Sequence, residues 1–400
     1  MGLFSLVIKL VVVTFACGQD APIEVEWTLD PASAKEEAVD KSIENTELVL
    51  AYVVFRHGDR TPDQEEIDLY PSSDVRGRNI FFPYGKKALT NKGKMRGFLA
   101  GKYLRERYDC FVSSLYLPEE ISIRTTNYAR TKMTALAALA ALYPPMPAQK
   151  WNPALDWQPV PYDTPPREDD DLLYWYNCES YMLLRDAVYD KPEVKKHLEY
   201  YRNLFPYLSE YTSNNITTPE QVFYLDNLFQ ALENVGVQTP KWAQDVMPKI
   251  KEMTKIEYAC EFYDADLIRF ASGVLLGEIL EAANAAVSGK AKEPRLRLIS
   301  AHENNVAGIM AAARVFKPHQ PHYGSTFSLE LRRYKSTGKY AIAAVYSPDA
   351  GGPGQLLPVA GCGEGELCDY DTFVKITQDH VWTKAEYEHA CHMTPNKDQK

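Results

Sequence analysis

The stretch that decides the fold is LVLAYVVFRHGDRTP, residues 48–62. Its first eight residues, Leu48 to Phe55, form a continuous apolar run rich in residues that favour β-structure. Such a run is typical of a strand buried on both faces of a sheet. The run ends abruptly in charge, with Arg56, His57 and Arg60. A buried strand that finishes this way predicts either an ordinary polar turn or a binding site for an anion.

The composition narrows the class of protein. The chain has 400 residues, enough for one large domain or two ordinary ones, with 45% hydrophobic and 24% charged residues. Its net charge is −10 and its pI about 5.4, which argues against binding nucleic acid through bulk charge. A local group of arginines is therefore an exception to an acidic chain.

The N-terminus is typical of an exported protein. An apolar core from Leu3 to Phe15 is followed by the small residues Ala16 and Gly18, so residues 1–18 are predicted to be a signal peptide. Residues 19–46 are acidic and poorly patterned, and we expect a loosely ordered segment there. The mature protein is expected to be secreted to the extracellular space rather than lysosomal, with no membrane span.

Cysteine usage agrees with export. Cys17 leaves with the signal peptide, and an even number in an exported chain predicts three disulfides with 15 possible connectivities. Asn215 begins an N-I-T acceptor sequence for N-glycosylation. The six cysteines that remain are Cys110, Cys178, Cys260, Cys362, Cys368 and Cys391.

The order of predicted elements indicates an α/β protein with an insertion. Residues 47–150 and 259–395 alternate strands and helices, which predicts an α/β catalytic core whose mixed sheet has helices on both faces. Residues 151–258 are rich in proline and acidic residues, and their regular segments look helical. We therefore predict a mostly helical cap there. A hairpin closed at residues 336–338 is also expected.

Three predicted strand ends carry unusual chemistry. Arg56 and His57 follow Phe55, Arg124 follows a short strand at residues 121–123, and His302 with Glu303 follows another buried strand. In open α/β sheets, ligands bind at the carboxyl ends of the strands. If these ends meet, Arg56, Arg60 and Arg124 surround one point, which suits a tetrahedral oxyanion.

His57 would then lie among these arginines. Neighbouring cations disfavour protonation of its imidazole, and a neutral imidazole is a competent nucleophile. A phosphohistidine intermediate would split ester hydrolysis into two steps, with the arginines stabilising the transferring phosphoryl group. His302 could donate a hydrogen bond to a phosphoryl oxygen, and Glu303 could protonate the leaving alcohol. The site thus predicts hydrolysis of phosphomonoesters.

The motif R-H-G-x-R-x-P at residues 56–62 makes a family resemblance specific. With RTTNYARTKM, HEN and LPVAGCGEGELC, it resembles the histidine acid phosphatases of the prostatic and lysosomal branch, in particular the insect venom enzymes, over residues 48–391. The resemblance implies a phosphoglycerate-mutase-like core, no metal or other cofactor, and dimers among relatives, so a homodimer stays open. It also implies His57 as nucleophile, with Arg56, Arg60, Arg124 and His302 as phosphate ligands.

The chain departs from the family in two respects. The family's proton donor is Asp, and here the position holds Glu303, whose extra methylene leaves open whether it fully replaces that donor. Cys178 with Cys391 and Cys362 with Cys368 match family disulfides. Cys110 and Cys260 have no family counterpart, and we predict that they pair with each other.

Two other functions remain as alternatives. A phosphoglycerate-mutase-like isomerase also begins at an RHG strand end, but Arg60 and Pro62 argue against it. An exported binding protein with an inactive pocket would bind phosphate without turnover. The substrate is not readable, and aryl phosphates, nucleotides, phosphotyrosine and lysophospholipids all remain open.

Overall fold

The strand predicted from the opening stretch is the centre of a seven-stranded sheet. The computed structural model describes residues 43–70, 80–291 and 294–392, so the predicted signal peptide lies outside the described residues. Strand β1 (Thr46–Arg56) is buried from Leu50 onward, as a strand covered on both faces must be. Of the segment 19–46, only residues 43–46 are described.

The sheet is mixed. Its order is β2-β3-β1-β4-β5-β6, with β7 paired to β5, and β1, β2 and β3 run parallel to one another while the other pairs are antiparallel. The predicted hairpin is formed by β4 and β5. The bounds are β2 (Ile121–Thr125), β3 (Leu296–Ala301), β4 (Thr326–Tyr334), β5 (Tyr340–Ser347), β6 (Gln355–Leu357) and β7 (Leu367–Asp369).

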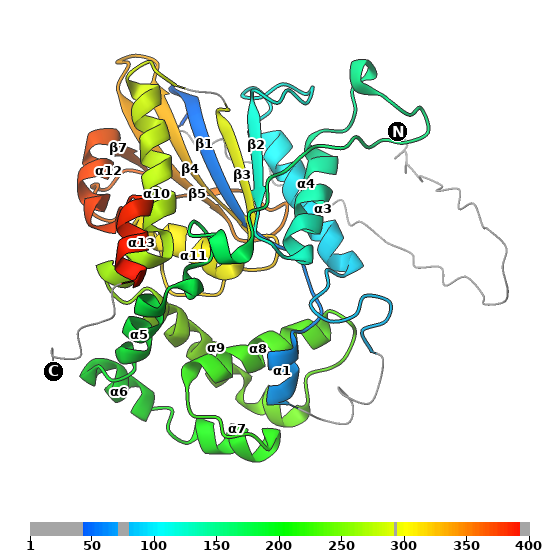
Figure 1. Cartoon of the computed structure of the whole chain (residues 1–400), viewed down its shortest axis with the longest axis vertical. Helices are drawn as coiled ribbons and strands as arrows, with labels where there is room; N and C mark the ends of the chain where they lie inside the picture. The colour runs from blue at the N-terminus through cyan, green and yellow to red at the C-terminus, as the bar shows by residue number, and fades with distance from the viewer. Residues whose placement is uncertain (1–42, 71–79, 292–293, 393–400) are drawn as a thin grey trace, which may run out of the picture. The chain divides into compact units, whose positions relative to one another are not determined.

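Helices cover both faces of this sheet (Figure 1), which confirms the predicted α/β class. One face carries α3 (Asn91–Arg107) and α4 (Ala129–Leu142). The other carries α10 (Ala265–Val287), α11 (Glu303–Ala312) and α12 (Tyr370–Thr377). Within the described residues, α10 alone is long and apolar enough to cross a membrane by length and composition. Half of its most apolar window is buried, and it packs on the sheet.

A group of helices lies beyond the end of the sheet where β1 finishes (Figure 1). We call α5–α9 the cap helices; together with α1 they share one apolar core, which also takes in Ala307 and Ala311 of α11. Their bounds are α1 (Gln64–Leu69), α5 (Glu179–Val188), α6 (Pro192–Glu199), α7 (Leu204–Thr212), α8 (Pro219–Glu233) and α9 (Lys241–Glu261).

The predicted cap boundaries do not coincide with breaks in the chain. Residues 151–178 contain only short 3₁₀ turns, such as η3 (Trp175–Asn177), and Asp163 pairs its backbone with β2. Residue 258 lies inside α9, and the chain from Val39 onward clusters as a single unit. The division into core and cap therefore stays a prediction.

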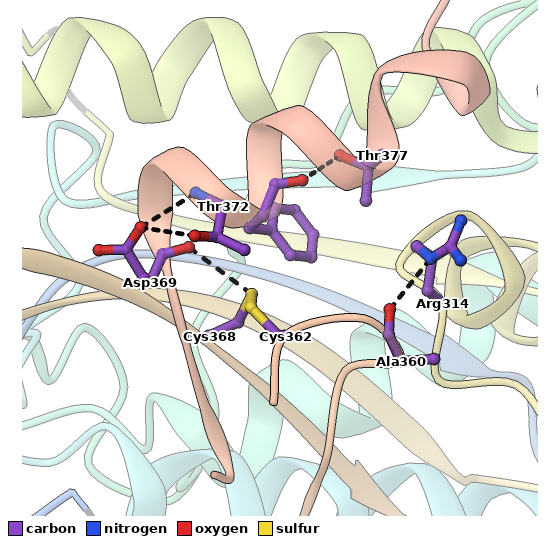
Figure 2. The surroundings of a disulfide bond; sticks show 8 residues. Arg314, Ala360, Cys362, Cys368, Asp369, Thr372 and Thr377 are labelled. Carbon is purple, nitrogen blue, oxygen red and sulfur yellow. Dashed lines mark hydrogen bonds between the residues drawn. A yellow bond between two sulfur atoms is a disulfide. The ribbon is translucent and has the colours of Figure 1, made fainter. Parts of the chain in front are cut away.

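Two of the predicted disulfides are present. Cys178 is joined to Cys391 with 5.0 Å between the Cα atoms, and so ties the start of α5 to α13 (Lys384–His392). The second bond, between Cys362 and Cys368, closes the loop that leads into β7 (Figure 2). Asp369, next to this bond, caps α12 by accepting a hydrogen bond from the amide of Thr372 at 3.0 Å.

The third predicted disulfide is wrong. Cys110 is an exposed free thiol in the turn after α3, whereas Cys260 is a buried free thiol on α9 inside the core of the cap helices. Cys110 lies at the surface and Cys260 lies in the core of the cap helices. An even number of cysteines does not indicate which of them are close enough to pair. Burial, with Glu257 nearby, raises the pKa of Cys260 to about 12 and makes its thiol unreactive. Asn215 is exposed between α7 and α8.

Helices α3 and α4 touch at a glycine, and this contact gives a stability prediction. A Cβ on Gly101 would lie 2.0 Å from the carbonyl oxygen of Ala138, whereas one on Gly97 would meet its nearest atom at 3.0 Å. Gly101→Ala is therefore expected to lower the free energy of unfolding by about 1–3 kcal/mol, despite the helix propensity of alanine. Gly97→Ala, on the same helix, is the control. Urea unfolding that finds both variants equally stable would refute the contact.

Candidate active site

The parallel register of three strands brings the predicted strand ends to one edge. Arg56 of β1 pairs with Ala301 of β3, and Thr125 of β2 pairs with Ser300. The backbone amide of His57 then donates to the carbonyl of Ala301 at 3.0 Å, so the two histidines that follow these strands are neighbours. The ring centroids of His57 and His302 are 5.3 Å apart.

The hydrogen bonds of His57 fix its tautomer. Nδ1 lies 2.8 Å from the carbonyl oxygen of Gly58, which can only accept, so Nδ1 carries the proton. Nε2 consequently has a free lone pair, and it accepts a hydrogen bond from Nε of Arg130 at 3.1 Å. Burial, followed by Arg130, His302, Arg56 and Arg60, holds the pKa of His57 well below its usual value. His57 is therefore a neutral imidazole whose Nε2 electron pair is directed at Arg130.

Gly58 and Asp59 anchor this loop to helix α3. A Cβ on Gly58 would lie 2.0 Å from the carbonyl oxygen of Gly93, so only glycine permits the approach. Asp59 is buried and forms ion pairs with Lys92 at 3.1 Å and Arg96 at 2.5 Å. The position of the loop that carries His57 is thus set by packing against α3.

Three buried guanidinium groups surround His57. Arg56 donates from Nη1 to the carbonyl of Pro321 at 2.7 Å, and Arg60 forms a two-pronged ion pair with Glu66 at 2.8 and 2.5 Å. The third, Arg130, contacts His57. Each arginine has at least one buried nitrogen without a hydrogen-bond partner, among them Nη2 of Arg56, Nε of Arg60 and Nη1 of Arg130. Unsatisfied buried donors of this kind suit an oxyanion ligand.

The remaining two groups complete the cluster. His302 is the N-cap of α11, and its Nε2 lies 3.0 Å from the hydroxyl of Thr126. Glu303 places Oε2 3.0 Å from Nε of Arg56 and 4.0 Å from Nε2 of His57. Burial alone would raise the pKa of Glu303, but Arg56, Arg60 and His302 outweigh it and lower the pKa to about 2. Glu303 is therefore a carboxylate in this arrangement.

Arg124 does not join this cluster. The strand β2 continues to Thr125, two residues beyond the predicted end, so Arg124 lies within the strand rather than after it. Its register partner, Ile299, packs on the α10 face of the sheet, and Nη2 of Arg124 binds Asp170 at 2.6 Å. Arg124 lines a different cavity, of about 970 Å³, next to α10. The structure brings together Arg56, His57, Arg60, His302 and Glu303, and leaves Arg124 out.

Arg130 is the residue that sequence reasoning missed. It lies in the first turn of α4, within the RTTNYARTKM stretch. A helix N-terminus disfavours positive charge, so a buried arginine there indicates a requirement other than helix stability. Burial, followed by the proximity of Arg60, lowers the pKa of Arg130. That signal was available in the sequence once the helix start was known.

The cluster opens into a cavity of about 310 Å³. Arg60, Arg130, His302 and Glu303 line one end of it. The rest of the lining comes largely from α1, α5, α8, α9 and the η3 turn, so three of the cap helices line the same cavity as the cluster. The lining there includes Glu65, Tyr174, Tyr176, Met182, Arg185, Glu220, Phe223, Tyr224, Glu257 and Glu261.

The comparisons with known proteins agree with this geometry. The sequence model of the histidine phosphatase superfamily, branch 2, matches residues 47–347. The chain belongs to this superfamily. It is 33% identical to venom acid phosphatase Acph-1 of Apis mellifera over 84% of this chain and 86% of that one. Identity to human prostatic acid phosphatase is 30%, over the same shares. The predicted family is confirmed, and the chain is a phosphatase.

A solved structure of the same fold was also found. Hafnia alvei phytase in complex with myo-inositol hexakis sulphate gives a TM-score of 0.65 at 14% identity, over 88% of this chain and 100% of that one. The chain therefore has the fold of the histidine phosphatases. At this identity the likeness supports the fold only.

His57, His302 and Glu303 also have the composition of a metal site. Their ligand atoms lie within 4.8 Å of one another. However, Arg56 contacts Glu303, and Arg130 contacts His57. Guanidinium groups so close to these side chains oppose the binding of a further cation. The described residues fit an anion better than a metal ion.

Chelation tests this conclusion. Dialysis against EDTA followed by assay with an aryl phosphate is expected to leave kcat/KM within about twofold, because no step needs a metal. Zinc added back serves as the control and is expected to give no gain. Loss of activity on chelation with recovery on adding zinc would contradict the anion site.

Proposed function

We propose that this protein is a secreted acid phosphatase that hydrolyses phosphomonoesters through a phosphohistidine at His57. The observation that carries the proposal is the lone pair of His57 Nε2, held neutral beside three buried arginines with unsatisfied donors. We place the phosphate between Arg56, Arg60, Arg130 and His302. Export and glycosylation at Asn215 belong to the proposal, supported by the N-terminal apolar run and the N-I-T acceptor sequence, and the name of the venom relative agrees with export. A homodimer stays open.

The proposed reaction has two displacements at phosphorus. His57 Nε2 attacks, an N–P bond forms, and the ester P–O bond breaks while Glu303 gives its proton to the leaving oxygen. Arg130 would exchange its bond to Nε2 for a phosphoryl oxygen as the substrate enters. A water molecule then attacks the phosphoryl group, passes a proton to Glu303, and the N–P bond breaks to restore neutral His57 and release phosphate.

The low pKa of Glu303 is compatible with this acid role. Arg56 and Arg60 keep its pKa near 2 only while they have no other anion to bind. A phosphate group among them adds negative charge beside Glu303 and raises its pKa, which favours the protonated form. The monoester, whose second pKa is about 6, can bring the proton with it at acidic pH. Acid conditions are therefore expected to favour turnover.

The arginine assignment can be tested with a matched pair. Arg130→Ala is expected to lower kcat/KM for an aryl phosphate by about 10²–10³-fold, as loss of one donor to a transition-state oxyanion does. Arg124→Ala, which leaves the cluster intact, is expected to stay within about threefold. A larger loss of kcat/KM in Arg124→Ala than in Arg130→Ala would mean that Arg124, and not Arg130, binds the phosphate.

Glu303 is tested by the dependence of the rate on the leaving group. Glu303→Gln is expected to slow hydrolysis of an alkyl phosphate by about 10²-fold, and that of 4-nitrophenyl phosphate much less, because only the alkoxide needs protonation. Glu303→Asp keeps a carboxyl group and should preserve the wild-type ratio of the two rates. Equal losses on both substrates in Glu303→Gln would exclude the proton-donor role.

The state of His57 gives a pH prediction. An ordinary histidine would protonate as pH falls through 6.5, and kcat/KM would drop tenfold per unit below it. Because the pKa of His57 lies well below 6.5, the nucleophile stays neutral at lower pH. We expect kcat/KM for an aryl phosphate to show no such fall between pH 6.5 and 5. A falling limb centred near 6.5 would mean that His57 titrates normally.

A further inference from the structure

The cavity continues from the catalytic end to a second wall that is rich in carboxyl groups. Four acidic residues line it on α1, α8 and α9, and we call them the wall carboxyls: Glu65, Glu220, Glu257 and Glu261. The proposed phosphate site uses none of them. They face the space that the leaving alcohol of a substrate would occupy.

The cations of this cavity are already compensated. Arg185, the basic residue of the second wall, pairs with Glu257 and lies 3.1 Å from Glu220. At the catalytic end, Arg60 binds both oxygens of Glu66. Among the described residues, neither Glu65 nor Glu261 takes part in an ion pair. Burial, followed by Glu257, raises the pKa of Glu261 to about 8, so this carboxyl is protonated at acidic pH unless a cation binds beside it. The other three wall carboxyls still outnumber Arg185, which leaves no cation in the second wall for another anion.

Glu261 is the feature that indicates a ligand. Glu261 is buried, with 6% of its surface exposed. Its Oε1 accepts a hydrogen bond from the hydroxyl of Tyr176 at 2.8 Å. Asn304, next to Glu303, donates in turn to that hydroxyl at 2.9 Å. Oε2 of Glu261 is buried and has no hydrogen-bond partner. A buried carboxyl oxygen left unpaired is costly, and a donor supplied by a ligand would satisfy it.

Aromatic rings complete the second wall. Tyr174, Tyr176, Phe223 and Tyr224 line the same cavity. Aromatic faces stabilise ammonium and guanidinium groups, and they also stack with aryl groups. Carboxyl groups beside such rings form a suitable environment for a cation and an unsuitable one for a second phosphate.

We propose that the wall carboxyls and these rings form a subsite for a positively charged leaving alcohol, an aryl or alkyl alcohol bearing an ammonium or guanidinium group. The subsite disfavours leaving groups that carry further phosphate, such as an inositol polyphosphate. It determines specificity for the reaction proposed above, and it rests on that reaction because the catalytic end must hold the phosphate.

A charge series of substrates tests the subsite. We would measure kcat/KM at pH 6 for the phosphates of 4-(aminomethyl)phenol, 4-(hydroxymethyl)phenol and 4-hydroxybenzoate, and for myo-inositol hexakisphosphate. The ratio of the cationic to the anionic aryl ester is the readout, compared between wild type and variants so that intrinsic reactivity cancels. Hydrolysis of the neutral ester reports separately on the proposed phosphatase activity.

Two variants and a matched control decide the outcome. Glu261→Gln and Glu220→Gln are each expected to lower the cation-to-anion ratio by about tenfold, because each removes a wall carboxyl. Glu252→Gln, on the exposed side of α9 where Glu252 pairs with Lys255, should leave the ratio unchanged. A ratio unaltered in both wall variants, or hexakisphosphate hydrolysed faster than the neutral ester, would overturn the subsite.

Binding of the product analogue tests the subsite without turnover. Calorimetry with 4-(aminomethyl)phenol and 4-(hydroxymethyl)phenol, in the presence of inorganic phosphate, is expected to show about tenfold tighter binding of the amine. Glu261→Gln should abolish that difference. Equal affinity of the two phenols for the wild type would refute the subsite even if no ester were hydrolysed.

Discussion

Mutual repulsion among three buried guanidinium groups is the constraint on which the site depends. Two unit charges 4 Å apart interact by about 4 kcal/mol at an effective dielectric constant of 20, so Arg56, Arg60 and Arg130 cannot share a pocket uncompensated. Glu66 and Glu303 supply the compensation by ion pairing. Burial, together with this positive potential, lowers the pKa of His57 and keeps it neutral. The proposed nucleophile, acid and phosphate site thus depend on one charge arrangement.

This arrangement is held in place by the sheet and by α3. The parallel register of β1, β2 and β3 fixes where the side chains begin, and the close approach of Gly58 to Gly93 fixes the loop that follows β1. Asp59 pairs with Lys92 and Arg96 of α3 and so holds the loop against that helix. A site built on strand ends needs this support because the charges inside it would otherwise push the loop outward.

The sequence predicted the parts that have a local signature. An apolar run followed by charge located β1 and His57, and two further strand ends located the edge where His302 and Glu303 lie. The sequence did not place Arg124, because the position of its side chain depends on where β2 ends. Side-chain direction alternates along a strand, so a strand one or two residues longer than expected changes which face or edge a residue occupies. Arg130 and the unpaired cysteines depend on tertiary packing, which local patterns do not contain.

The hydrogen bond from Nδ1 of His57 to the carbonyl of Gly58 makes the orientation of the imidazole a local property of the loop. The partner that orients the imidazole lies one residue further along the same loop, so no distant carboxylate has to be retained for that purpose. The unit that sets the tautomer is therefore only two residues long. Substitutions in the cap helices that keep this bond are expected to leave Nε2 unprotonated.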